Sequence, residues 1–289
     1  MKINFLNDNL HLNNLYRKPL IRLMISNNIL ITYYELSFFS IIKFILLSLK
    51  NFSISSSIKS NLIFSCLFFS RGLVILNGLG RFKRAFIFRY IIFLLIKFNF
   101  NKNYAVQNYL DYRYFKRFSL KNIVFICGSG GINQRTANNT SATNFVAVQR
   151  KKKISLTKMS LKDFSKVTGN KIDIIGLQPD EFNEQNGLIR SIGLRKPEQL
   201  FNGYTDFVQP DGYGEGFPHS LACAIVSDMK IHIEKKQFIE LGLYRFGLNL
   251  MKNDKWYSFY PNNKLKKSID SEEVSKEYLR AIFSFTKKN

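Results

Sequence analysis

The sequence predicts an α+β protein: a basic, mainly helical N-terminal region, then a polar basic loop, then a small mixed α/β domain. Three observations support this fold class. The first 120 residues hold three long apolar stretches, residues 128–144 are polar without hydrophobic periodicity, and the remainder mixes helix and strand patterns. A chain of 289 residues is long enough to bury cores in such parts.

Positive charge is spread unevenly along the chain. The formal net charge is +23, and residues 1–120 hold 17 Lys and Arg against only Asp8, Glu35 and Asp111. Residues 121–289 hold the other 26 bases and 17 acids. A surface with this excess repels itself unless a polyanion lies against it. We expect nucleic acid first and an anionic membrane surface second.

The apolar stretches are compatible with two environments. The longest is long enough to span a bilayer, but its apolar gain of about 6 kcal/mol is offset by Glu35, Lys43 and several hydroxyls. Arg71 interrupts the second stretch, and the third contains Arg89 and Lys97. Burial in a protein core is therefore favoured over membrane insertion. The stretches are Ile29–Leu49, Leu62–Leu79 and Ala85–Phe98.

Clusters of cations suggest where a polyanion would bind. Basic residues flank a glycine turn at 78–84, and rings alternate with cations at 109–118, where they either stack on bases or pack into a core. The polar segment 128–144 leads into four consecutive cations, which either thread into RNA or remain solvated. The predicted RNA-binding residues are Arg71, Arg81, Lys83, Arg84, Arg113, Lys116, Arg117, Arg135, Arg150, Lys151, Lys152, Lys153 and Lys158.

The C-terminal part carries recognisable element boundaries. A short helix is predicted after Ser160 and ends at Gly169, and 171–177 reads as a strand. Alternating apolar residues predict a hairpin between 229–234 and 238–250. Asp270 is expected to cap a final helix over 271–284.

No catalytic or metal-binding pattern emerges. Cys66, Cys127 and Cys223 are far apart, and His219 with Cys223 has no second pair to complete a zinc site. Residues 207–220 bring two carboxylates near His219, but their glycines and prolines predict a turn-rich connection. The glycines after 123–127 lack phosphate-loop spacing. The sequence therefore predicts no enzyme, no metal and no cofactor.

The chain resembles, as a class, organelle-encoded mitochondrial ribosomal proteins from A/T-rich protist genomes. The resemblance rests on the abundance of Phe, Tyr, Ile, Asn and Lys and on the basic segments at 71–84 and 109–162. It implies a mitochondrial, non-catalytic ribosome constituent whose partners are rRNA and neighbouring ribosomal proteins. The alternative is an organelle-encoded subunit of a respiratory or ATP-synthase membrane complex. The expected parts are 1–120, 121–162 and 163–289.

Overall fold

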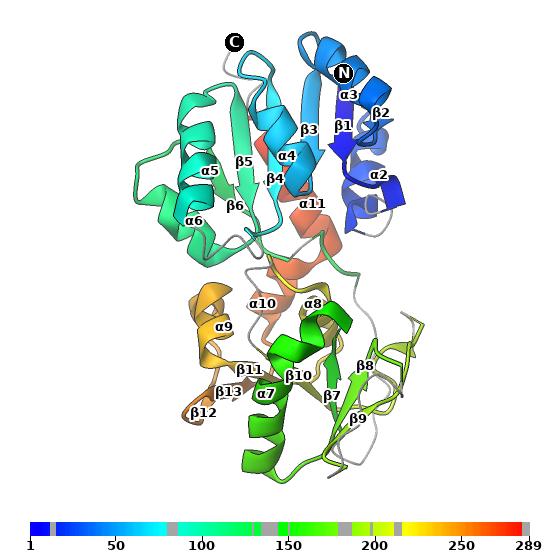
Figure 1. Cartoon of the computed structure of the whole chain (residues 1–289), viewed down its shortest axis with the longest axis vertical. Coiled ribbons are helices and arrows are strands. Elements are labelled where there is room, and N and C mark those ends of the chain that lie inside the picture. Colours follow the sequence, from blue (N-terminus) through cyan, green and yellow to red (C-terminus); the bar gives the residue numbers. More distant parts are fainter. Residues whose placement is uncertain are drawn as a thin grey trace. The chain divides into compact units, whose positions relative to one another are not determined.

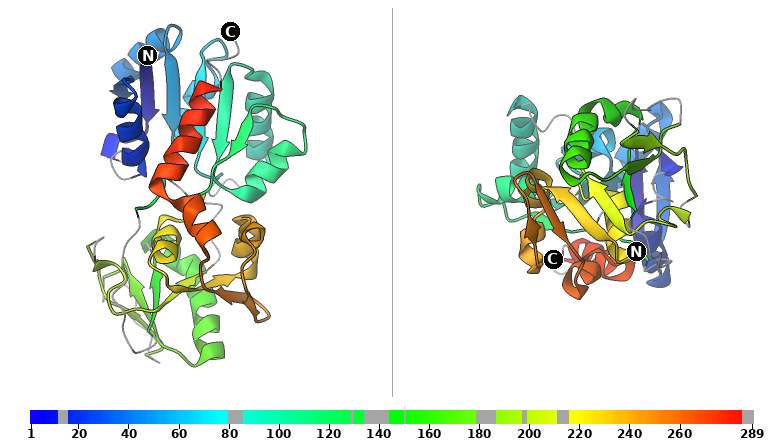
Figure 2. Two further views of the ribbon diagram at one scale, coloured as in Figure 1. Left: turned by 180° about the vertical axis from the view of Figure 1, so that it is seen from behind. Right: turned by 90° about the horizontal axis from the view of Figure 1, so that it is seen from below.

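The chain divides into two units, which we describe separately (Figures 1 and 2). The N-terminal unit comprises Met1–Ile132, Tyr213–Pro218 and Ser268–Asn289, and the C-terminal unit comprises Asn133–Gly212 and His219–Lys267. The computed structural model describes residues 1–11, 16–79, 86–128, 130–133, 144–149, 151–178, 187–196, 199–210 and 216–284, without the side chains of 86, 151–153, 155 and 156.

A six-stranded parallel sheet forms the centre of the N-terminal unit, in the order β2-β1-β3-β4-β5-β6. Helices cover both faces of such a sheet, so its central strands are buried along most of their length. All five residues of β4, for example, are buried. The strands are β1 (Lys2–Asn7), β2 (Leu30–Tyr34), β3 (Phe52–Ser56), β4 (Gly72–Leu76), β5 (Lys102–Val106) and β6 (Ile123–Phe125).

Two hydrophobic cores lie on opposite faces of this sheet. Helices α2 (Lys18–Ser26) and α11 (Ser271–Phe283) pack on one face, where Figure 2 shows α11 lying across the strands. The other face carries the remaining helices, which are α3 (Phe38–Ser48), α4 (Ile58–Ser65), α5 (Phe86–Phe98) and α6 (Tyr109–Lys116). Asp270 Oδ1 accepts the backbone N–H groups of Glu272 and Glu273, which confirms the predicted cap of α11.

The C-terminal unit is built on a seven-stranded sheet in the order β12-β13-β11-β10-β7-β8-β9. The neighbouring strands β11, β10, β7, β8 and β9 run parallel to one another, and β13 pairs antiparallel with both β11 and β12. The strands are β7 (Phe145–Val148), β8 (Ile172–Ile175), β9 (Ile189–Ser191), β10 (Asp206–Gln209), β11 (Lys230–Glu234), β12 (Met251–Lys252) and β13 (Trp256–Phe259). The helices are α7 (Lys151–Thr168), α8 (His219–Val226), α9 (Lys235–Glu240) and α10 (Asn263–Ile269), with a 3₁₀ helix at Leu243–Phe246.

The prediction of a mainly helical N-terminal region is wrong, because the protein is an α/β structure with two parallel-rich sheets. The stretch Ile29–Leu49 contains strand β2 followed by helix α3, and Leu62–Leu79 contains the end of α4 followed by β4. Neither strand alternates, because β4 is buried at all five positions and the edge strand β2 reads LITYY. Hydrophobic periodicity therefore does not separate these strands from the adjoining helices. None of the helices that the structure describes is long and apolar enough to cross a membrane.

Two local predictions in the C-terminal unit are also corrected. The expected hairpin is absent from the described residues, because β11 runs directly into helix α9 and pairs with β13 instead. Helix α7 begins at Lys151, before the predicted start after Ser160, and ends as predicted before Gly169, whose φ is +68°. The strand expected over 171–177 is confirmed as β8.

A buried lysine lies beneath helices α4 and α5. Lys102 opens β5 and is fully buried; its Nζ donates to the Leu67 carbonyl at 2.5 Å and to Asn99 Oδ1 at 2.8 Å. The ammonium also lies 4.8 Å from the centre of the Phe64 ring. Burial lowers the pKa of Lys102 to about 8 because the low-dielectric surroundings disfavour the charged form.

This depressed pKa predicts a pH-dependent stability difference. Between pH 8 and the ordinary lysine value of 10.5, the unfolded chain binds more protons than the folded chain, so Lys102 makes stability rise with pH. We expect Lys102→Met to lack this contribution. Urea unfolding of both proteins from pH 7 to 10.5 measures it, and the matched pair cancels the titration of other groups. A constant difference between the two proteins over that range would contradict the assignment.

Candidate functional site

The parallel sheet of the N-terminal unit has one edge suited to binding a ligand. The chain moves from β1 to β2 in one direction and then continues through β3 to β6 in the other direction. The connections at the carboxyl ends of β1 and β3 therefore diverge and leave a crevice. Ligands of open α/β sheets bind at this kind of topological switch point.

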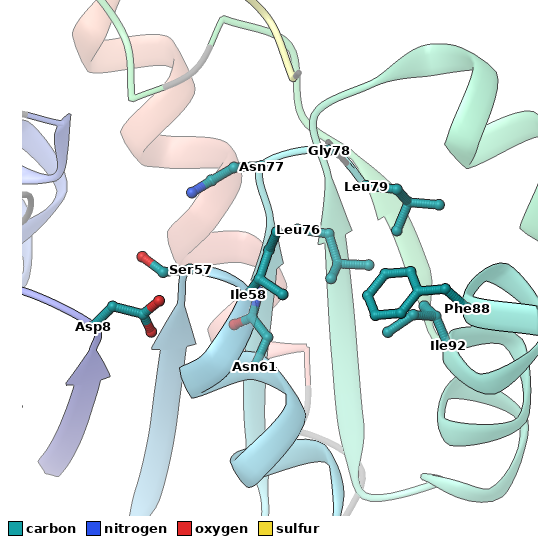
Figure 3. A pocket seen from close by; sticks show the side chains of 10 residues that line it. All are labelled: Asp8, Ser57, Ile58, Asn61, Leu76, Asn77, Gly78, Leu79, Phe88 and Ile92. Atoms are coloured by element: carbon teal, nitrogen blue, oxygen red, sulfur yellow. The ribbon is translucent and has the colours of Figure 1, made fainter. Parts of the chain in front are cut away.

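A pocket of about 380 Å³ lies at this switch point (Figure 3). Its polar residues follow the ends of β1, β3 and β4 or lie on α4, and Figure 3 shows Leu79, Phe88 and Ile92 together on the opposite side. The pocket therefore offers hydrogen bonds on one wall and an apolar surface on the other. It is lined by Asp8, Ser57, Asn61 and Asn77, and by Ile58, Leu76, Gly78, Leu79, Phe88 and Ile92.

Asp8 joins the pocket to the start of helix α4. Its Oδ1 accepts the backbone N–H of Ser60 at 2.9 Å and the hydroxyl of Ser60 at 2.6 Å. Ser57, just before the helix, donates its hydroxyl to Asn7 Oδ1 at 2.6 Å and has a φ of +88°. A left-handed conformation costs a non-glycine residue about 1–2 kcal/mol. The turn that presents Asp8 and Ser57 is thus held by side-chain hydrogen bonds at the cost of backbone strain.

A buried cation, Arg17, lies at the same edge of the sheet. Its Nη2 donates to Asn77 Oδ1 at 2.5 Å and to Ser56 Oγ at 3.4 Å, beyond the ends of β4 and β3. The guanidinium carbon lies 5.5 Å from the centre of the Tyr278 ring on α11. These contacts fix the orientation of Asn77, which is itself a pocket residue.

A glycine from a distant part of the sequence also contacts the end of β4. The backbone N–H of Gly216 donates to the Asn77 carbonyl. A Cβ atom at this position would collide with that oxygen and lie 3.0 Å from Gln107 Cβ. Only glycine therefore allows this close approach. Sequence reasoning placed residue 216 within a turn-rich connection.

The C-terminal unit has a second switch point, between β7 and β10. The chain leaves β7 toward β8 and β9, then returns to β10 and β11 on the other side. Only Gln149 and Arg150 separate β7 from α7, whose first turn holds Lys151, Lys152 and Lys153 and no acid. Cations in a first turn oppose the helix dipole, which favours anions there. This combination therefore calls for an external anion at the N-terminus of α7.

A buried Asp–His–Ser arrangement in the C-terminal unit resembles a catalytic triad. His232 Nε2 is 2.6 Å from Asp206 Oδ1, and Nδ1 is 2.7 Å from Ser258 Oγ. Burial raises the pKa of Asp206, but hydrogen bonds from His232 and Thr205 outweigh it and hold that pKa below its usual value. The rings of Phe145 and Phe164 lie within 5.3 Å of the imidazole ring centre. Because these rings enclose the imidazole, we assign the arrangement to the core.

The sequence-predicted cations do not converge in the described structure. Exposed Arg113 and Lys116 belong to α6 and exposed Arg117 is its C-cap, whereas exposed Arg71 precedes β4 at the opposite edge of the sheet. Lys158 lies on α7 in the other unit, half-buried. The side chains of Lys151, Lys152 and Lys153, and all of Arg81, Lys83, Arg84, Arg135 and Arg150, lie outside the described residues.

The pocket residues were missed at the sequence level, although a signal for them exists. Short polar residues stand at the carboxyl end of each of three strands, at Asn7-Asp8, Ser56-Ser57 and Asn77. That pattern identifies carboxyl ends only once the strands are recognised.

Within the described ranges, no group of His, Cys, Asp and Glu could hold a metal ion.

No protein family and no curated protein matches this chain. Solved structures do match it. Anabaena HepE in complex with UDP-glucose gives a TM-score of 0.58 at 11% identity, over 99% of this chain and 92% of HepE. HepE with UDP and glucose gives 0.58 at 9% identity, over 100% and 98% of the two chains. At these identities the likeness establishes the fold, which is that of GT-B glycosyltransferases.

These findings correct the function predicted from composition. The similar structures are glycosyltransferases, so the assignment to the mitochondrial ribosome is wrong, and so is the alternative of a respiratory or ATP-synthase membrane subunit. The predicted partners, rRNA and ribosomal proteins, are likewise contradicted, because the similar structures hold UDP and UDP-glucose. The prediction of a non-enzyme is contradicted by the same likeness. Net charge indicates an anionic partner but not which one. An A/T-rich genome favours codons for Phe, Tyr, Ile, Asn and Lys whatever the protein does, so their abundance does not identify a function.

The close approach of Gly216 to β4 yields a prediction. Gly216→Ala places a methyl group against the Asn77 carbonyl, and we expect a loss of about 3 kcal/mol of stability, since a backbone oxygen cannot move aside. The control is Gly203→Ala, where φ is +85° and no atom lies within 4 Å, so only about 1 kcal/mol of backbone strain is expected. Thermal or urea unfolding compares them. Equal losses would contradict the packing argument.

Proposed function

We propose that this protein is a glycosyltransferase that moves a sugar from a nucleoside diphosphate sugar to a hydroxyl group of an acceptor. The observation that carries the proposal is the likeness of the whole chain, across both units, to a protein whose structures hold UDP and UDP-glucose. Each unit of this chain also presents a switch point of the kind at which α/β sheets bind ligands.

The switch point of the C-terminal unit suits the diphosphate. A diphosphate carries charge that builds up further as the sugar departs, so its binding site needs fixed positive potential. The N-terminus of α7 provides backbone N–H groups, and its first turn carries Lys151, Lys152 and Lys153. Arg150 directly precedes the helix. We assign these four residues to stabilising the leaving diphosphate.

The pocket of the N-terminal unit suits the acceptor. Asp8, Ser57, Asn61 and Asn77 offer oxygen and amide groups that hydrogen-bond hydroxyls, and the apolar wall offers a surface for a carbon skeleton. Among these polar residues, Asp8 is the one with a carboxylate, which can accept a proton as a base. Its Oδ1 holds α4 through Ser60, so its second oxygen is the one assigned to the acceptor proton.

The reaction then needs three coupled events. The bond between the anomeric carbon and the diphosphate oxygen breaks, and its electron pair leaves with the diphosphate. The acceptor oxygen forms a new bond to the anomeric carbon. The proton of that hydroxyl passes to the Asp8 carboxylate, which acts as general base. The cations of the α7 first turn neutralise the charge that the leaving group gains.

The diphosphate assignment predicts opposite effects on binding and stability. Replacing Lys151, Lys152 and Lys153 with Gln removes charge from the binding site, so we expect the Kd for UDP to rise at least about tenfold. The same change relieves repulsion with the helix dipole, so the free protein should unfold at an equal or slightly higher temperature. Calorimetric titration and thermal unfolding measure the two effects.

The matched control for this experiment replaces three exposed lysines of the same unit, Lys235, Lys252 and Lys267, with Gln. This variant has the same net charge as the test variant and should bind UDP as the wild type does. Uridine, which lacks phosphate, should bind both variants equally. If the control weakens UDP binding as strongly as the test variant, the first turn of α7 is not the diphosphate site.

The role of Asp8 yields a separate prediction. In Asp8→Asn the amide oxygen still accepts from Ser60, so the cap of α4 and the stability should persist. The amide is not a base, so kcat should fall by about 10²–10⁴-fold in a UDP-release assay with a transferable acceptor. Asp8→Ala removes both the base and the oxygen that accepts from Ser60, so it should also lose about 1 kcal/mol of stability. Full activity of Asp8→Asn would exclude Asp8 as the base.

A further inference from the structure

Helix α3 exposes an apolar row to solvent. Phe39, Ile42, Leu46 and Leu49 are spaced three and four residues apart, so they share one face of the helix, and all four are exposed. The side chain of Phe39 is 82% exposed. A surface helix of a globular protein usually turns its apolar row inward and its polar residues outward. Here Phe44 faces the core, and a second apolar row faces outward.

Helix α5 repeats this pattern. Ile87 and Ile91, four residues apart, and Phe98, a further seven along, are exposed on one side of it, while Ile92 and Ile96 pack into the core. The turns that follow α4 and α5 add Phe69 and Phe100, which are 88% and 79% exposed. The outer helix face is defined by Phe38, Phe39, Ile42, Leu46, Leu49, Phe68, Phe69, Ile87, Tyr90, Ile91, Phe98 and Phe100.

These residues belong to neighbouring helices on one side of the sheet. Helices α3, α4 and α5 pack into the same core, and Figure 1 shows them in front of the strands. The rings of Phe44 on α3 and Phe64 on α4 are 5.7 Å apart. Asn99, just after α5, donates to the Ser65 carbonyl of α4 at 2.8 Å. The outer helix face thus gathers exposed apolar residues of neighbouring helices on one side of the sheet, and exposed apolar residues gathered in this way mark an interaction site.

The charge of this segment selects the partner. Residues 36–110 hold ten Lys and Arg and not one Asp or Glu. Lys43 and Lys50 lie beside the apolar row of α3, and Lys97 lies beside that of α5; all three are exposed. An anionic partner is attracted to this face, whereas a second copy of the chain would bring like charges together. Aliphatic side chains such as Ile42 and Leu46 offer no stacking to nucleic-acid bases.

We propose that the outer helix face binds the surface of an anionic lipid bilayer. The helices lie in the interface with the apolar rows among the acyl chains and the lysines at the headgroups, as in amphipathic surface helices. This is attachment to the surface of the bilayer, which needs no helix that crosses it. It does not rest on the proposed glycosyl transfer. Helix α5 also contributes Phe88 and Ile92 to the pocket, so the bilayer surface lies close to the pocket's apolar wall.

Vesicle sedimentation tests the proposal with the full chain. The wild type should sediment with vesicles of phosphatidylcholine and phosphatidylglycerol at 3:1, and less with phosphatidylcholine alone. The variant Phe39→Ser, Leu46→Ser, Ile91→Ser, Phe98→Ser should lower the partition coefficient at least about tenfold, because exposed apolar side chains are removed without touching the core. Lys43→Gln, Lys50→Gln, Lys97→Gln should lower binding and its dependence on salt.

The matched control replaces four exposed apolar residues of the other unit, Met159, Val167, Leu194 and Tyr260, with Ser and should sediment as the wild type does. Equal binding of wild type and the apolar variant would overturn the proposal, as would equal binding to neutral vesicles. If the wild type dimerises without binding vesicles, and the apolar variant does not dimerise, the face is assigned to self-association instead. UDP binding should be unchanged in the apolar variant and in the lysine variant. Vesicle binding by a protein that does not bind UDP would refute the proposed function alone.

Discussion

Parallel pairing of the strands is the constraint on which the rest of this structure depends. A parallel strand cannot follow its neighbour through a tight turn, so each must return through a helix across a face of the sheet. The carboxyl ends of all strands then lie at one edge, and both faces are covered. In the N-terminal unit this brings Asp8, Ser57 and Asn77 together, although they are 49 and 20 residues apart in sequence. The pocket is a consequence of the pairing.

The same constraint explains the distribution of polar residues in the N-terminal unit. Its interior takes few charges. Two buried cations, Arg17 and Lys102, lie at opposite edges of the sheet. Arg17 lies at the carboxyl edge with Asn77 and Ser56, whereas Lys102 opens β5 at the amino edge with Asn99 and the Leu67 carbonyl. Strand ends have unpaired backbone groups and side chains that can satisfy a buried cation. The middle of the sheet holds apolar residues, such as Val74, and uncharged polar residues, such as Ser53.

Sequence reasoning succeeds here where a local signal determines the structure. The Asp270 cap, the end of α7 at Gly169 and strand β8 each follow from a few neighbouring residues, and each is confirmed. Sequence reasoning fails where pairing between distant segments determines the structure. The run Ile29–Leu49 is apolar throughout, and only its pairing with β1 makes Leu30–Tyr34 a strand. The pocket lies beyond such reasoning for the same reason, since its polar residues become neighbours only after strands β1, β3 and β4 are in register.

The excess of positive charge illustrates how a correct physical premise can lead to a wrong partner. The premise that +23 requires an anion remains sound. Long-range charge is blind to the shape of the anion, so it could not separate rRNA from a diphosphate or a lipid surface. Local structure separates them. The first turn of α7, with its three lysines, is the place we assign to a compact anion, as suits a helix N-terminus. The lysines beside the exposed aliphatic rows of α3 and α5 suit an extended surface that is apolar beneath its charge. Neither arrangement resembles a groove for a nucleic-acid backbone, which needs cations that follow one path, and Arg71, Arg113 and Lys158 lie on different elements.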